Sequence, residues 1–233
     1  YDIELQCQPS DLGIHTAPEI PVDVSSPAAM VSRIESAVDY YLTFNKLLGL
    51  IGGEHTITIG AVTAIARKYP ALSVVVFDAH ADMRNTYQES QFSHACVTRR
   101  ITEICPATVL GTRSLSEEES DAIKNTDNLE LHISSDGTLP NWKDVENSIS
   151  PFVYISIDLD VLDPGIMPAV GTPEPGGIMW YPLLKLLKTL AHNRQIVGFD
   201  ITELNPLEGS ESCVYTAAKL AYKIIGYSTI KPR

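Results

Sequence analysis

The sequence predicts an α/β protein built on a parallel β-sheet that helices cover on both faces. Short, almost wholly apolar runs such as Leu72–Phe77 and Phe152–Ile157 are typical of strands buried on both sides. Segments of helical periodicity lie between these runs, and this alternation favours parallel pairing. The 233 residues, 44% of them hydrophobic, suit one such domain and are too few for two comfortable ones.

The expected elements follow from apolar spacing and from capping residues. A short strand at Ile3–Cys7 precedes a proline-punctuated loop. Ser25 or Ser26 can cap the next helix, with Pro27 in its first turn and a buried face that repeats as far as Leu42. The other expected strands are Leu47–Ile51, Leu72–Phe77, Ala107–Gly111, Leu129–Ile133, Phe152–Ile157 and Gln195–Ile201. The other expected helices are Thr56–Tyr69, Ala95–Ile104, Glu117–Lys124, Tyr181–His192 and Ser212–Ile225.

Charge and cysteine usage narrow the class of protein. A formal net charge of -12 argues against binding to a nucleic-acid backbone and permits attraction of a small cationic substrate. The four cysteines show no Cys-x-x-Cys pair, so we expect reduced thiols in a cytoplasmic protein. No apolar run approaches the ~20 residues of a membrane span, and no signal peptide is visible. We therefore expect neither a nucleic-acid nor a membrane partner.

Six possible metal ligands follow three of the expected strands. Parallel strands bring their carboxyl ends to one edge of the sheet, where sites of α/β proteins lie. Carboxylates are seldom buried unless they are paired or bind a metal, and oxygen donors with a few imidazoles suit divalent cations such as Mn2+. If the segment after Phe77 stays extended, alternate side chains converge on one point. The six residues are His55, Asp78, His80, Asp82, Asp158 and Asp160.

Four motifs in sequence order resemble the signatures of the ureohydrolase family, which includes arginase and agmatinase. They are Gly-Gly-Glu-His55, Phe77-Asp-Ala-His-Ala-Asp82, Ser156-Ile-Asp-Leu-Asp-Val-Leu-Asp-Pro164 and Phe199-Asp-Ile-Thr-Glu-Leu-Asn-Pro206. The resemblance spans residues 51 to 206, most of the chain. It implies a three-layer α/β/α fold, two Mn2+ ions per chain and a homo-oligomer, commonly a trimer or hexamer. Mn2+, Co2+, Fe2+ and Zn2+ can all occupy such ligands.

The resemblance also implies how the ligands divide between the two ions. One ion would take His55, Asp78, Asp82 and Asp158. The other would take His80, Asp78, Asp158 and Asp160, which leaves Asp78 and Asp158 as bridges. In the implied reaction a hydroxide that bridges the metals attacks the guanidinium carbon, and the leaving amine then takes a proton.

Three further roles are carried over from the family. Asp160 matches the carrier of the proton for the leaving amine, and Glu203 matches the acid that pairs with the guanidinium group. His94, in Phe92-Ser-His-Ala-Cys96, matches a catalytic histidine that is proposed as a proton shuttle. An isolated histidine that opens a helix is otherwise more often structural.

The substrate is the harder question. Arginase-like sequences carry an acidic residue after Gly-x-Arg, where this chain has Ser114 after Arg113. The run Gly171-Thr-Pro-Glu-Pro-Gly-Gly177 resembles the agmatinase branch. These points favour hydrolysis of agmatine to putrescine and urea, a step of polyamine biosynthesis. Guanidinobutyrase and arginase stay open as alternatives, since Arg113 could face a carboxylate, and the loop Met83–Gln91 is expected to contact the distal end of the substrate.

Two other hypotheses compete with that of a catalytic ureohydrolase. A zinc deacylase of related fold would carry a tandem His-His pair, which the sequence lacks. A non-catalytic, metal-binding relative would have lost a ligand, His94 or Glu203, and all of them are present. Residues 1–233 are expected to form one ureohydrolase domain without the strand and helix that usually precede this region in the family.

Overall fold

Six parallel strands form one sheet across the part of the chain that the structure describes. The structure is a computed structural model, and it describes residues 1–230. The strand order is β1-β6-β5-β2-β3-β4, and every neighbouring pair runs parallel. The bounds are β1 Leu48–Ile51, β2 Leu72–Phe77, β3 Ala107–Thr112, β4 Leu129–Ile133, β5 Phe152–Asp158 and β6 Gln195–Thr202. Each lies within one residue of the strand expected from the sequence, so the predicted α/β class is confirmed.

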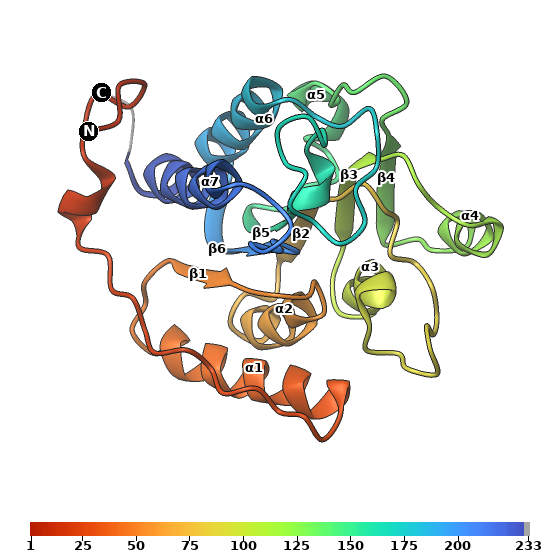
Figure 1. Cartoon of the computed structure of the whole chain (residues 1–233). Helices are drawn as coiled ribbons and strands as arrows, with labels where there is room; N and C mark the ends of the chain where they lie inside the picture. Colours follow the sequence, from red (N-terminus) through yellow and green to blue (C-terminus); the bar gives the residue numbers. More distant parts are fainter. Residues whose placement is uncertain (231–233) are drawn as a thin grey trace.

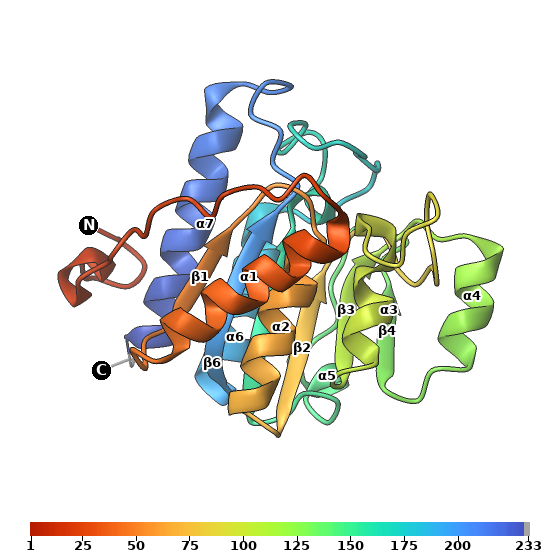
Figure 2. The ribbon, with the colours of Figure 1, turned by 90° about the horizontal axis from the view of Figure 1, so that it is seen from below.

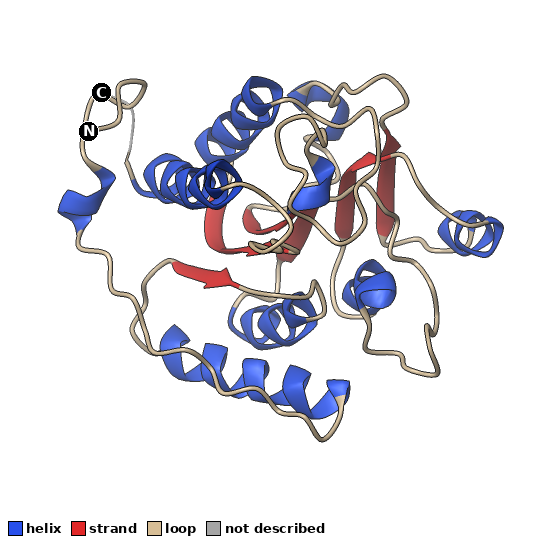
Figure 3. Cartoon of the chain, viewed as in Figure 1, coloured by secondary structure: helices blue, strands red, loops and turns tan. Residues whose placement is uncertain are grey.

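Helices cover the sheet on both faces (Figures 1 and 3). α1, α2 and α3 pack on one face, and α5, α6 and α7 pack on the other, each with its own apolar core. α4 stands beyond the β4 edge (Figure 2). The bounds are α1 Pro27–Leu42, α2 Ile57–Lys68, α3 Val97–Thr102, α4 Glu117–Lys124, α5 Trp142–Val145, α6 Trp180–Asn193 and α7 Glu211–Thr229. Three 3-10 turns complete the list: η1 Pro9–Leu12, η2 His94–Cys96 and η3 Leu159–Val161.

The local signals explain most of these bounds. Ser26 caps α1 by accepting the Ala29 N–H, and Pro27 occupies the first turn, as expected. α2 lies against α1 because Gly60 has no side chain; a Cβ added there would lie 2.5 Å from the backbone oxygen of Val31. α5 was not expected, since a four-residue helix is too short to show a helical period. Among the described residues, no helix combines the length and apolar character needed to cross a bilayer.

The predicted strand Ile3–Cys7 is wrong. Residues 3–6 form a turn that an Asp2–Cys7 bridge closes, and Gln6 takes the left-handed conformation at φ 52°. Alternate side chains of this segment turn towards α7, but they are the acids Asp2 and Glu4, which pair with Lys223 at 2.8 and 2.7 Å. Ion pairs with a helix therefore fix the segment, where the sequence pattern suggested strand pairing.

We expect Lys223→Met to lower the free energy of unfolding by about 3 kcal/mol, because breaking a buried ion pair leaves an uncompensated charge. Asp2 and the Lys223 side chain are both buried, at 1% and 8% exposure. Urea denaturation measures the change, with Lys185→Met on the exposed side of α6 as the matched control. Equal midpoints for the two variants would contradict the assigned role of the pair.

The same cluster predicts a loss of stability in acid. Burial opposes ionisation, but hydrogen bonds from Lys223 hold the pKa of Asp2 and of Glu4 at about 2. Both values lie below the ordinary 3.8 and 4.5, so the contribution is complete above pH 4.5 and disappears as the pH falls through 2. Urea midpoints of the parent and of Lys223→Met should therefore converge over that range. If the difference between the two urea midpoints did not change with pH, Asp2 and Glu4 would be excluded as the source of that difference.

Candidate metal centre

The predicted ligands lie together at the carboxyl edge of the sheet. His55 lies in the loop after β1, Asp78 directly follows β2, and Asp158 ends β5. Phe77 of β2 pairs with Ile157 of β5, so parallel register brings the next residues, Asp78 and Asp158, to adjacent positions. The buried apolar strands fix where these polar side chains emerge.

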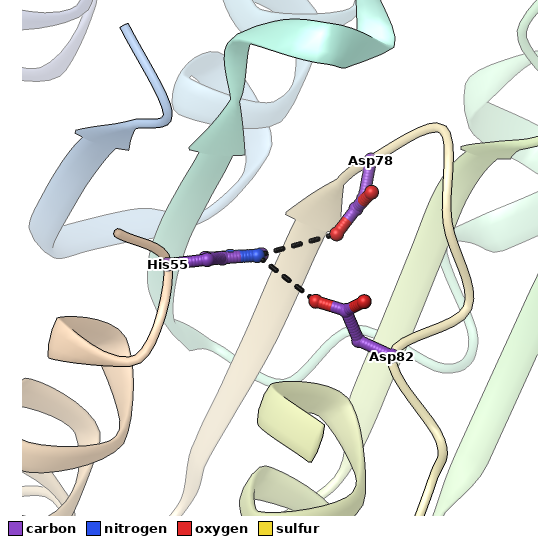
Figure 4. A group of neighbouring side chains, drawn as sticks. All are labelled: His55, Asp78 and Asp82. Carbon is purple, nitrogen blue, oxygen red and sulfur yellow. Dashed lines mark hydrogen bonds and ion pairs between the residues drawn. The ribbon is translucent and has the colours of Figure 1, made fainter. Parts of the chain in front are cut away.

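One group of ligands lies at Nδ1 of His55, and Figure 4 shows two of its acids, Asp78 and Asp82. Its Nδ1 lies 3.3 Å from Asp78 Oδ2, 3.2 Å from Asp82 Oδ2 and 3.4 Å from Asp158 Oδ2. All four residues are buried. Asp82 reaches this position with a left-handed backbone at φ 52°, a conformation that costs a non-glycine residue energy and often marks functional sites.

A second group lies on the other side of Asp78. His80 Nδ1 is 2.9 Å from Asp160 Oδ2 and 3.7 Å from Asp78 Oδ1. Asp160 lies in η3, where its N–H donates to Asp158 Oδ1 at 2.9 Å and its own Oδ1 accepts the Ala79 N–H. Asp78 thus contributes one oxygen to each group. Potential ligand atoms of His55, Asp78 and Asp82 lie within 4.8 Å of one another, and so do those of Asp78, His80 and Asp160.

The expected convergence of Asp78, His80 and Asp82 on a single point is wrong. Strand β2 ends at Phe77, and the chain beyond it is not extended through Asp82. His80 and Asp82 therefore fall into separate groups. The structure places all six candidate ligands at one edge of the sheet, in two groups that share Asp78.

The charges in this cluster fit divalent cations. Asp78 Oδ2 is buried and makes no hydrogen bond with any described residue. Burial and the charge of Asp78 raise the pKa of Asp82 to about 8, and burial with the charge of Asp160 raises the pKa of Asp158. Such carboxylates repel one another when all are ionised, and a cation between them removes that cost. Oxygen donors with a few imidazoles are also a donor set that Mn2+ and related ions accept.

Asp200 orients His55 through Ser156, a role that we did not predict from the sequence. It is a fully buried acid in β6, and it accepts hydrogen bonds from Ser156, Thr58 and Tyr154 at 2.7 to 2.8 Å. Because the Ser156 hydroxyl donates to Asp200, it accepts from His55 Nε2, 2.9 Å away. Nδ1 is then the ring nitrogen that turns towards the carboxylates, which orients His55 as a ligand.

Glu203 and His94 both contact the loop that carries His55. Glu203 has a left-handed backbone at φ 63°, donates its N–H to Gly53 and accepts the His55 N–H at 2.6 Å. Burial raises the pKa of Glu203. His94 opens η2, and its backbone N–H and Nδ1 lie 3.0 and 2.9 Å from Glu54 Oε1. That hydrogen bond raises the pKa of His94.

Arg113 does not face a free carboxylate site. Its Nη2 donates to the backbone oxygens of Asp160 and Glu174 at 2.8 Å each, and its Nε donates to that of Pro175 at 3.1 Å. Its Nη1 adds bonds to two further carbonyls. The guanidinium group therefore joins the loops after β3 and β5, and these bonds use the donors that a substrate carboxylate would need.

Comparison with known proteins agrees with this geometry. The model of the Arginase family matches residues 1–226. The chain is 38% identical over 236 residues to N(1)-aminopropylagmatine ureohydrolase of Synechocystis sp., covering 97% of this chain and 77% of the relative. It is 35% identical over 230 residues to agmatinase of Pyrococcus horikoshii, covering 98% and 78%. The crystal structure of agmatine ureohydrolase of Thermoplasma volcanium matches with a TM-score of 0.75 and 32% identity, over 89% of this chain and 71% of that one.

The family match covers most of the chain, and the relatives exceed 30% identity over more than two thirds of its length. These matches agree with the motifs found in the sequence and with the parallel sheet that carries the site. The chain belongs to the arginase family and is a hydrolase of the agmatinase-like ureohydrolase type.

Proposed function

We propose that this chain hydrolyses the guanidinium group of agmatine to give putrescine and urea, with two Mn2+ ions at the candidate metal centre. The observation that supports this most strongly is the pair of buried ligand groups that share Asp78 in a chain of the arginase family. His55, Asp78, Asp82 and Asp158 would hold one ion, and His80, Asp78, Asp158 and Asp160 would hold the other.

The residues around this centre would each perform a separate task. When bound, two divalent cations would lower the pKa of a water molecule, so that it could act as a nucleophile near neutral pH. Glu203 accepts hydrogen bonds from the guanidinium N–H groups and so places the guanidinium carbon. As water adds to that carbon, Asp160 would take one of its protons and then pass that proton to the departing amine as the C–N bond breaks, leaving urea. His94 exchanges protons between the site and solvent.

The acidic residues near the candidate metal centre support an amine at the far end of the substrate. Glu203 contacts the loop after β1, where it accepts the His55 N–H, and Glu174 Oε1 lies 3.9 Å from His80 Nε2. Arg113 bonds to backbone carbonyls. Acidic residues near the metal centre attract a substrate that is cationic at both ends and disfavour one that ends in a carboxylate. This favours agmatine over 4-guanidinobutyrate.

A second candidate substrate is N1-aminopropylagmatine, which carries an additional amine. The relative from Synechocystis sp., 38% identical over 97% of this chain, is named for that compound. The acidic residues described above would accommodate either molecule, because both have a guanidinium group at one end and cationic amine at the other.

Urea release by the Mn2+-loaded protein tests the proposal. Agmatine, N1-aminopropylagmatine, arginine and 4-guanidinobutyrate are compared at equal concentration by kcat/KM. We expect one of the two amines to exceed both acids by at least roughly a hundredfold, since an unpaired carboxylate in an acidic site costs several kcal/mol. A preference for either acid would refute the assignment of an amine substrate.

A further inference from the structure

Glu54 makes contacts on both of its carboxylate oxygens. Oε1 accepts from the His94 backbone N–H at 3.0 Å and lies 2.9 Å from His94 Nδ1. Oε2 accepts from the Thr56 hydroxyl at 2.7 Å. Thr56, in the same loop, therefore fixes the Glu54 carboxylate. The carboxylate in turn contacts both the backbone and the ring of His94, forty positions further along the sequence.

The ring of His94 has a second fixed neighbour. Tyr87 lies edge-on to it, with ring centroids 5.5 Å apart. Tyr87 belongs to a tight turn in which its N–H and carbonyl bond to those of Ser90 at 2.8 and 3.0 Å. Together Glu54 and Tyr87 fix two sides of the ring. Nδ1 is occupied by Glu54, whereas Nε2 has no protein partner among residues 1–230 and is free to exchange protons.

The same loop also fixes two other parts of the centre. The backbone N–H of His55 donates to Glu203, and its ring faces Asp78 and Asp82. Glu54 is the adjacent residue, so one short segment sets where His94 stands relative to Glu203 and to the metal ligands. A shift of about 1 Å in such an arrangement can cost roughly a hundredfold in rate.

We propose that Glu54 is a positioning residue, which holds His94 through Nδ1 and so leaves Nε2 free to exchange protons with the reacting groups. The proposal rests on the function proposed above. The pair contributes little to folding stability, because the His94 and Glu54 side chains are 46% and 50% exposed. Its effect should therefore appear in the reaction and leave stability unchanged.

A double-mutant cycle with Glu54→Ala and His94→Ala tests this coupling. We expect Glu54→Ala to lower kcat for urea release by roughly tenfold to a hundredfold, with KM little changed. In the His94→Ala background, the same substitution should cause no further loss. Equal losses in both backgrounds would overturn the proposal. Glu54→Gln keeps an acceptor of the same reach and should recover most of kcat, and Glu118→Ala, an exposed acid on α4, is the matched control.

Two measurements keep this test separate from the proposed substrate. The bound metal of Glu54→Ala should equal that of the parent; a loss would place the effect in neighbouring His55 and overturn the proposal. Nitrogen NMR of the full chain should show a proton on Nδ1 of His94 in the parent, and Glu54→Ala should remove that preference. An unchanged His94 signal would refute the role of Glu54. If no guanidino compound were hydrolysed, the proposed function would be refuted. The NMR result would still decide whether Glu54 positions His94.

Discussion

Asp158→Asn should abolish most urea release and reduce the number of divalent cations that the chain binds. Asp158 Oδ2 lies 3.4 Å from His55 Nδ1, and its Oδ1 accepts the Asp160 N–H, so it contacts both ligand groups. An amide of the same shape loses the charge and most of the metal affinity. Without the metals the pKa of the attacking water is not lowered. The transition state then loses several kcal/mol of stabilisation, which lowers the rate roughly a thousandfold or more.

The stability of the same variant provides an independent check. Burial and the charge of Asp160 raise the pKa of Asp158, so the ionised group is costly in the metal-free fold. With a chelator present, Asp158→Asn should unfold at the same temperature as the parent or higher. Added Mn2+ should raise the unfolding temperature of the parent much more than that of the variant. Asp127→Ala, an exposed site, is the control, and an Asp158→Asn variant with two tightly bound ions would contradict the assignment.

Glu203→Gln should lower kcat/KM by roughly a hundredfold to a thousandfold, a loss typical of removing one electrostatic partner of the transition state. Metal content should not change, because Glu203 belongs to neither ligand group. The glutamine oxygen can still accept the His55 N–H, so the loop should keep its place. A parallel decrease in bound metal would show that the loss arises in the metal centre.

Steady-state kinetics with agmatine and metal analysis of the same samples measure the effect of Glu203→Gln. Glu208→Gln is the matched control, since Glu208 is exposed and follows the same strand. Because burial raises the pKa of Glu203, parent activity should also fall as the pH drops through that raised value. Undiminished activity of Glu203→Gln would exclude the proposed pairing with guanidinium.

The sequence predicted the sheet well because its strands carry their own signal. β2 and β5 are buried along nearly their whole length, and continuous apolar runs of this length are typical of strands that are covered on both faces. The acids directly after these strands were predictable for the same reason, since the strand ends determine where they emerge. The error at Ile3–Cys7 arose because its alternation reflects pairing of Asp2 and Glu4 with Lys223, a residue more than two hundred positions away.

The parts of the site that escaped prediction depend on contacts between distant segments. Glu54 stands in a recognised motif, but its partner His94 opens η2 after an irregular segment. Hydrophobic periodicity does not predict where such a segment runs. Arg113 looked available for a substrate, and only the structure reveals its bonds to backbone oxygens of the loop after β5. Asp200 offered one signal, an acid within an apolar strand, and three hydroxyl donors explain it.

Strand β1 is the shortest of the six strands and leads directly to the loop of His55. It is four residues long, and among the described residues its sheet partner is β6 alone. The loop that carries Glu54 and His55 is thus attached to the shortest strand of the described sheet. In a protein of these 233 residues, the backbone amides of β1 should exchange with deuterium sooner than those of β2 and β5, because small openings at a strand with one partner cost less than unfolding the centre. His55, in the loop after this strand, would then lose its place before Asp78 and Asp158 do.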